Sequence, residues 1–111
     1  MLRILVLRTK CLDEARHFYE SLGFQFTEEQ YGTGPRHYAA AIGDSVFELY
    51  PSAVDVSDTT RLGFTVQSLT RVMDRLKTSN AVVVSPLKAT TRGFRAVVRD
   101  PDGRAVELDE C

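Results

Sequence analysis

Two short stretches, one near the middle of the chain and one near its end, repeat the same pattern and constrain the fold more than any other feature. They are Val46–Leu49 (VFEL) and Ala105–Leu108 (AVEL), and their glutamates, Glu48 and Glu107, lie 59 residues apart. A repeat of this period in a chain of 111 residues indicates two similar halves, each ending on a strand that carries one carboxylate.

The first repeat belongs to a predicted β-hairpin whose turn is Gly43-Asp44. A two-residue type II′ turn requires a positive φ at its first residue, which glycine adopts without strain. Counting outward from this turn pairs Ala39 with Glu48 and His37 with Tyr50. Because opposed residues share a face of a sheet, we expect a polar face that carries His37, Glu48 and Tyr50. The opposite, apolar face should pack into the core with Tyr38, Ala40, Phe47 and Leu49.

The second repeat belongs to a second predicted hairpin, with its turn at Asp100–Gly103. This turn could be a four-residue loop or a three-residue loop with a bulge, and the two choices differ in which residues share a face. If Ala96 and Val98 face the core, Arg95 lies on the same face as Glu107.

The remaining sequence predicts the same order of elements in both halves. Apolar residues recur every three or four positions in two segments, one ending at Gly23 and one following Ser68, which is typical of amphipathic helices. Besides the hairpins, we predict strands 2–8, 24–29, 61–66 and 81–85, helices 12–22 and 69–80, and loops 31–35 and 86–91. The fold class is therefore α+β, a single domain of two tandem β-α-β-β-β modules, 1–51 and 61–111, joined by the linker 52–60.

Composition argues against several classes of partner. The formal net charge is −1 and charges of both signs are interspersed, so neither nucleic acid nor a membrane surface is an expected partner. We expect a cytoplasmic protein, because the opening segment is too short and too alternating for a secretory signal. Cys11 and Cys111 are expected to be reduced thiols. No glycine-rich phosphate loop or nucleophile elbow occurs.

Three segments together resemble the glyoxalase, bleomycin-resistance and ring-cleaving dioxygenase superfamily, also called vicinal oxygen chelate proteins. They are Leu12–Phe24, Phe47–Pro51 and Arg99–Leu108, and their order and spacing extend the resemblance over nearly the whole chain. The resemblance implies paired β-α-β-β-β modules whose curved sheets enclose a cavity for a small molecule. It also implies a homodimer, because the cavity of such proteins is commonly completed or shared between two chains.

The resemblance also bears on metal binding. In metal-using members, each module supplies a histidine near the start of its first strand and a glutamate on its last strand. The glutamates carry over to Glu48 and Glu107, but Ile4 and Arg61 stand at the histidine positions. We therefore expect a small-molecule binder with no metal cofactor. The alternative is a metal-dependent lyase or isomerase in which Glu48 and Glu107, with or without His37, hold a divalent ion.

The candidate catalytic residues are His37, Glu48 and Glu107, and His37 could act as a general base or as a hydrogen-bond donor. Its alternative role is that of a partly exposed strand histidine. We expect Arg61 to enter the cavity and pair with the glutamates in place of an ion, or else to reach the rim unpaired. Arg95 could bind a ligand carboxylate or phosphate, or be a surface arginine. The other candidate ligand-binding residues are Tyr31, Tyr50 and Thr65.

Overall fold

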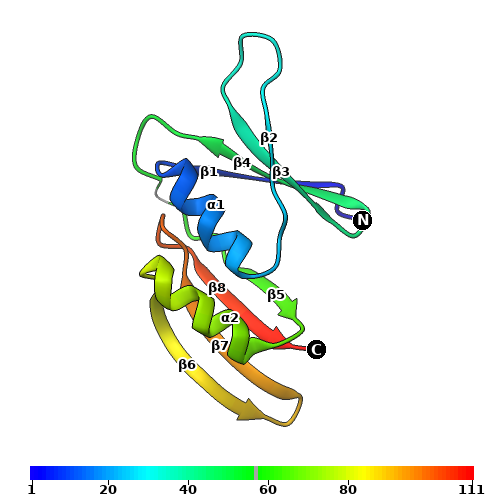
Figure 1. Ribbon diagram of the computed structural model, residues 1–111, viewed down its shortest axis with the longest axis vertical. Helices are drawn as coiled ribbons and strands as arrows, with labels where there is room; N and C mark the ends of the chain where they lie inside the picture. Colours follow the sequence, from blue (N-terminus) through cyan, green and yellow to red (C-terminus); the bar gives the residue numbers. More distant parts are fainter. Residues whose placement is uncertain (57) are drawn as a thin grey trace.

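The computed structural model describes residues 1–56 and 58–111, and its strands form two four-stranded sheets (Figure 1). In chain order the elements are β1 (Ile4–Thr9), α1 (Leu12–Ser21), β2 (Thr27–Glu29), β3 (His37–Ile42), β4 (Ser45–Pro51), β5 (Leu62–Val66), α2 (Leu69–Leu76), the 3-10 helix η1 (Lys77–Ser79), β6 (Val82–Thr90), β7 (Gly93–Arg99) and β8 (Ala105–Glu110).

The two halves have the same topology. The N-terminal sheet has the strand order β1-β4-β3-β2 and the C-terminal sheet the order β5-β8-β7-β6. In each sheet the first and last strands of the half run parallel and the other neighbours antiparallel. This confirms the α+β class with two tandem β-α-β-β-β modules. In the predicted linker, residue 57 lies outside the described residues, and residues 52–56 and 58–60 are in neither helix nor strand.

The register of the first hairpin agrees with the prediction. Ile42 pairs with Ser45 and Ala39 with Glu48. Gly43 has a φ of 54° whereas Asp44 is not among the positive-φ residues, which excludes a type I′ turn and fits type II′. The apolar face is buried as expected, with Tyr38, Ala40, Phe47 and Leu49 in the core.

The structure resolves the open question about the second hairpin. The backbone N–H of Asp100 donates to the carbonyl of Arg104 at 3.0 Å, and the N–H of Gly103 donates to the carbonyl of Asp100 at 2.9 Å. Gly103 has a φ of 91°, so the turn is a three-residue loop that closes with a glycine bulge. Arg95 therefore lies on the face that carries Glu107, as the alternation of buried residues had indicated.

Three predicted elements differ clearly from the structure. The predicted helix 69–80 ends as an α-helix at Leu76 and continues only as the 3-10 helix η1 to Ser79. The expected strand 24–29 is reduced to Thr27–Glu29, because Phe24 and Phe26 turn their rings onto Phe47 in the core instead of continuing the ladder. The predicted loop 86–91 is wrong, since β6 continues to Thr90. Pro86 is tolerated there because β6 is an edge strand, and the ladder is irregular around it.

One hydrophobic core joins the helices to both sheets. The two helices lie side by side (Figure 1), and each buries an apolar stripe against the strands. Tyr19 of α1 packs edge-on against Phe47 of the N-terminal sheet at 5.0 Å and against Phe64 of the C-terminal sheet at 6.3 Å between ring centroids. Burial of these rings is a large favourable term, because each removes well over 100 Å² (about 150–250 Å²) of surface from water.

A buried polar network also ties the two halves together. The guanidinium of Arg104, only 3% exposed, pairs with Asp100 at 3.1 Å and with Asp58 at 2.9 Å. It also donates to the backbone carbonyl of Arg8 on β1 at 2.6 Å. The hydroxyl of Tyr19 donates to the same Asp100 carboxylate at 2.7 Å, and burial together with this carboxylate raises the pKa of Tyr19 far above its usual value. The second hairpin is thereby attached to α1 and β1.

Two expectations from composition can also be compared with the structure. Cys11 and Cys111 are free thiols, as predicted. Among the described residues, no helix combines the length and the apolar character needed to cross a bilayer.

We expect Asp100→Ala to destabilise the protein strongly, by about 3 kcal/mol, because it leaves the buried Arg104 guanidinium and the Tyr19 hydroxyl without a shared acceptor. Urea unfolding of the two proteins measures the difference. Asp55→Ala is the matched control, since Asp55 also pairs with a cation, Lys10, but on the surface, and its loss should change stability little. Equal effects of the two substitutions would contradict the structural role of the buried network.

Candidate functional site

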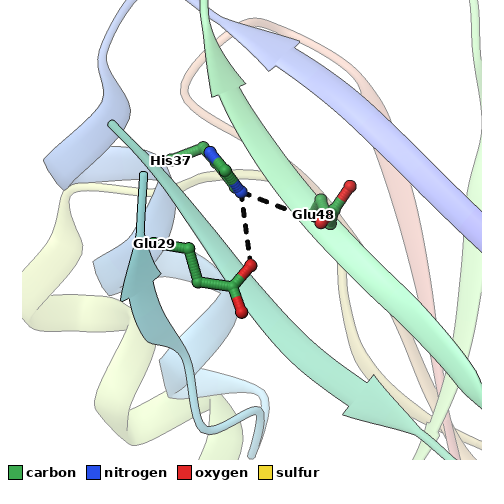
Figure 2. Close-up of side chains that lie close together, drawn as sticks. All are labelled: Glu29, His37 and Glu48. Carbon is green, nitrogen blue, oxygen red and sulfur yellow. Dashed lines mark hydrogen bonds and ion pairs between the residues drawn. The ribbon is translucent and has the colours of Figure 1, made fainter. Parts of the chain in front are cut away.

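Side chains from three neighbouring strands meet on one face of the N-terminal sheet (Figure 2). The Nε2 atom of His37 on β3 lies 3.3 Å from Oε1 of Glu29 on β2 and 3.9 Å from Oε2 of Glu48 on β4. One ligand atom from each of these residues lies within 4.8 Å of the other two. The hydroxyl of Tyr50 is 3.4 Å from the same Nε2. We call Glu29, His37, Glu48 and Tyr50 the histidine centre.

Strand pairing positions these residues. Glu29 is directly opposite His37 in the β2–β3 register, and Glu48 is opposite Ala39, one diagonal step from His37. Diagonal neighbours on one face of a sheet are within reach of long side chains. The short strand β2 therefore adds the second carboxylate to the His37–Glu48 pair that the hairpin register predicts.

The imidazole of His37 is fixed and buried. Its Nδ1 lies 3.2 Å from the carbonyl oxygen of Pro35, so an Nδ1–H donates there. The ring stacks on Tyr50 at 4.2 Å between centroids, and the tilted ring of Tyr31 lies 5.1 Å away. Only 1% of His37 is exposed, so the alternative of a partly exposed strand histidine is wrong.

The two glutamates of the histidine centre have few other partners. Tyr31 donates a hydrogen bond to Oε1 of Glu29 at 2.9 Å, and this bond raises the pKa of Tyr31 and keeps its hydroxyl protonated. Glu48 is 8% exposed, and in the described part of the chain its carboxylate accepts no hydrogen bond. Neither Glu29 nor Glu48 forms an ion pair with a lysine or arginine of residues 1–56 and 58–111.

A second group of charges lies on the C-terminal sheet, and we call it the arginine centre: Arg61, Arg95 and Glu107. Nε of Arg61 donates to Oε1 of Glu107 at 2.7 Å, and its Nη2 donates to the same oxygen. Nη2 of Arg95 lies 2.8 Å from that oxygen and its Nε 3.9 Å from Asp109. Hydrogen bonding from Arg61, aided by the charges of both arginines, holds the pKa of Glu107 below its ordinary value.

The candidate residues form two groups in the single chain. Arg61 pairs with Glu107 as predicted, but its side chain is 58% exposed and lies at the surface of the single chain. Among the described residues, no hydrogen bond or ion pair joins the histidine centre to the arginine centre. Thr65 is exposed and lies opposite Asp109 in the β5–β8 register.

Two cavities of the single chain are not lined by the residues of either centre. One of about 880 Å³ is bounded by the end of α1, the first hairpin, β5 and the start of α2, and Thr65 is the candidate residue that lines it. Another of about 620 Å³ lies between α1 and the segment after α2. Neither is lined by His37, Glu48 or Glu107. The arginine centre is partly exposed, whereas His37 and Glu48 are largely covered by their own chain.

Comparison with known proteins identifies the family. The model of the Glyoxalase/Bleomycin resistance protein/Dioxygenase superfamily matches residues 2–108, and the chain belongs to this family. A search of curated proteins finds no match.

Solved structures share the fold at low sequence identity. The hypothetical protein SA1046 from S. aureus has a TM-score of 0.77 at 17% identity, covering 100% of this chain and 96% of that one. The fosfomycin resistance protein FosX from Mesorhizobium loti has a TM-score of 0.74 at 15% identity, covering 98% and 90%. The oxidase ChaP-H2 has a TM-score of 0.76 at 16% identity, covering 97% and 91%.

The residues of this chain do not fit the two-His, two-Glu metal site of the family. Ile4 cannot donate a ligand, and Arg61, at the other histidine position, places a guanidinium on the carboxylate that the metal would need. A metal ion at Glu107 would have to displace both Arg61 and Arg95. Within residues 1–56 and 58–111, the group that can supply several ligand atoms to one ion is instead Glu29, His37 and Glu48.

Glu29 is the one member of the histidine centre that the sequence analysis missed. The strand that contains it was predicted, but residues 30–36 separate it from His37, and a loop of that length does not fix the register. The available signal was the alternation of polar and apolar residues that ends at Glu29. This alternation indicates a strand, and such a strand could have been paired with the polar face that carries His37.

We expect the pKa of Glu107 to rise toward 4.5 in Arg61→Ala, and to rise further when Arg95→Ala is added, because the remaining arginine still pairs with Glu107 in the single variant. Since the folded-state pKa is lowered, the pairing stabilises the folded protein above pH 4.5, and this contribution is lost as the pH falls through the lowered pKa. NMR titration of the Glu107 carboxyl measures the shift. Arg92→Ala, at an exposed turn, is the control, and an unchanged pKa in the double variant would refute the pairing.

Proposed function

We propose that this protein binds a small polar or aromatic molecule between its sheet faces, without the two-His, two-Glu metal site. The observation that carries this proposal is the arginine centre, in which Arg61 and Arg95 converge on one oxygen of Glu107. Family membership supports a small-molecule function in general, and solved neighbours with the same fold include proteins named for fosfomycin resistance and for oxidase activity.

The arginine centre provides the chemistry for an anionic group. A guanidinium carries five N–H donors, and the single oxygen of Glu107 occupies only some of those on Arg61 and Arg95. The remaining donors are partly exposed and can bind a carboxylate or phosphate in a bidentate manner. Gly63, opposite Glu107 in the register, adds no side chain, so this part of the face stays open to a ligand.

The proposed cavity requires a second sheet face. In one chain the arginine centre is partly exposed, and so are apolar side chains beside the histidine centre, including Ile4, Val6 and Val46. Stable proteins seldom leave a contiguous apolar face uncovered unless it binds something. We propose a homodimer in which a face of one chain covers a face of the other and completes the cavity.

A second candidate function is a metal-dependent lyase or isomerase that uses Glu48 and Glu107. The close approach of His37 to Glu48 favours a role for this carboxylate in metal binding. Glu107, the second glutamate of this candidate metal site, however, already forms ion pairs with the guanidinium groups of Arg61 and Arg95. In this candidate function, metal binding would depend on Glu107, so Glu107→Gln would abolish it, whereas the small-molecule binder needs no ion at Glu107.

We expect benzoate and phenyl phosphate, at millimolar concentration, to raise the melting temperature, because a ligand that binds only the folded state stabilises it. Benzyl alcohol, which has the ring without the charge, is the matched probe and should have a smaller effect. The variant with Arg61→Ala and Arg95→Ala should lose the response to the anions, while Arg92→Ala keeps it. An anion response that survives in the double variant, or no response in the parent, would count against the proposed binding site.

Sedimentation at micromolar concentration should show a dimer, because sheet faces with exposed apolar residues favour association. Val46→Glu, which places a charge on the exposed face of β4, should shift the protein toward monomer. Val54→Glu, at an exposed valine outside the sheets, is the control and should leave the dimer intact. A monomeric parent would remove the proposal of a shared cavity.

A further inference from the structure

We propose that Glu29, His37 and Glu48 bind a divalent first-row transition-metal ion. All three ligands come from β2, β3 and β4 of the N-terminal sheet, so the site is complete within one chain. It uses neither of the family's histidine positions and does not involve Glu107. This proposal is independent of the small-molecule binding proposed above, and it departs from the metal-free expectation of the sequence.

The spacing of the donor atoms fits a metal ion better than a shared proton. Nε2 of His37 lies 3.3 Å and 3.9 Å from the two carboxylate oxygens. The 3.3 Å contact is long for a charge-assisted N–H···O bond, which is about 2.7–2.9 Å, and the 3.9 Å contact is beyond hydrogen-bond distance. Ligand bonds of about 2.0–2.2 Å place neighbouring donor atoms roughly 3.0–3.5 Å apart, so small side-chain adjustments would form a coordination shell.

The orientation of the imidazole supports the same conclusion. Because Nδ1–H of His37 donates to the carbonyl of Pro35, the lone pair of the neutral ring is on Nε2 and points toward Glu29 and Glu48. A backbone carbonyl that accepts from one ring nitrogen while the other binds the ion is the usual arrangement of metal-binding histidines. Tyr31 in turn orients the Oε1 atom of Glu29 through its hydroxyl.

A bound dication would balance the negative charge of the histidine centre. Two carboxylates face one imidazole, and the side chain of Glu48, which is 11% exposed, has no hydrogen-bond donor among the described residues. A buried, unpaired carboxylate is costly, and the arginine centre shows how the C-terminal half satisfies the equivalent Glu107 with two guanidinium groups. No lysine or arginine of the described chain does this for Glu48, and a bound dication would.

The ligand set indicates the class of metal. Imidazole favours zinc, nickel, iron and copper over magnesium, and two carboxylates broaden the choice to manganese. Three protein ligands leave at least one position of a tetrahedral or octahedral shell for water or a substrate oxygen. Tyr50, whose hydroxyl lies 3.4 Å from Nε2, borders that open position.

The test is metal titration of untagged protein, first stripped with a chelator and then freed of it, with chlorides of zinc, nickel, manganese and magnesium. Calorimetry should show one zinc or nickel ion per chain, with weaker manganese binding and no tight magnesium binding. Each bound ion should also raise the melting temperature.

Variants locate the site. His37→Gln and Glu29→Gln should each weaken zinc binding by at least about tenfold. His17→Gln and Glu28→Gln are the matched controls, because His17 is the other histidine of the chain and Glu28 is the exposed neighbour of Glu29. If the buried His37 variant does not fold, Glu29→Gln, whose side chain is about one-third exposed, still tests the site.

A measurement on the unaltered protein completes the test. Paramagnetic manganese should broaden the ring signals of His37 at low ratios and leave those of His17 sharp. The proposal is overturned if no transition metal binds, if Glu29→Gln and His37→Gln bind as tightly as the parent, or if the His17 signals broaden first. Since no small molecule is used, these results are separable from any failure of ligand binding at Arg61 and Arg95.

Discussion

The arrangement of this protein depends on the burial of one charged side chain, Arg104, between its two halves. Its guanidinium pairs with Asp100 and Asp58 and donates to the backbone of β1. Buried ion pairs seldom stabilise more than an apolar replacement would, but a single missing partner is expensive. The network, together with the packing of Tyr19 between aromatic rings of both sheets, therefore favours one way of joining the halves. Each sheet face is thereby fixed relative to the helices.

The two halves neutralise their equivalent glutamates in different ways. Each carries a glutamate at the equivalent position of its last strand, Glu48 or Glu107. In the C-terminal half, Arg61 and Arg95 neutralise Glu107 from within the chain, which lowers the pKa of this carboxyl. In the N-terminal half the corresponding carboxylate faces His37 and a second carboxylate. One half therefore contains its own counter-charge, and we infer that the other obtains its counter-charge from a bound ion.

Local chemistry explains how far the sequence alone could predict this structure. Gly43 allowed the first turn to be predicted from the sequence. The turn in turn predicted the pairing of Ala39 with Glu48 and the shared face of His37 and Glu48. The resemblance to the family placed Arg61 near Glu107. The Glu29 contact could not be predicted, because the loop 30–36 leaves the β2 register open. The extension of β6 through Pro86 was missed because a proline is tolerated only on an edge strand, and strand order is a property of the whole fold.

We infer that the histidine centre and the arginine centre are chemically separate, one suited to a cation and one to an anion. Crystals of the protein soaked with zinc or manganese test this most directly through anomalous scattering. We expect one strong peak per chain among Glu29, His37 and Glu48, and none at Glu107. A peak shared by Glu48 and Glu107, with Arg61 and Arg95 displaced, would show that the ion occupies the family's metal position and that the two centres are not separate.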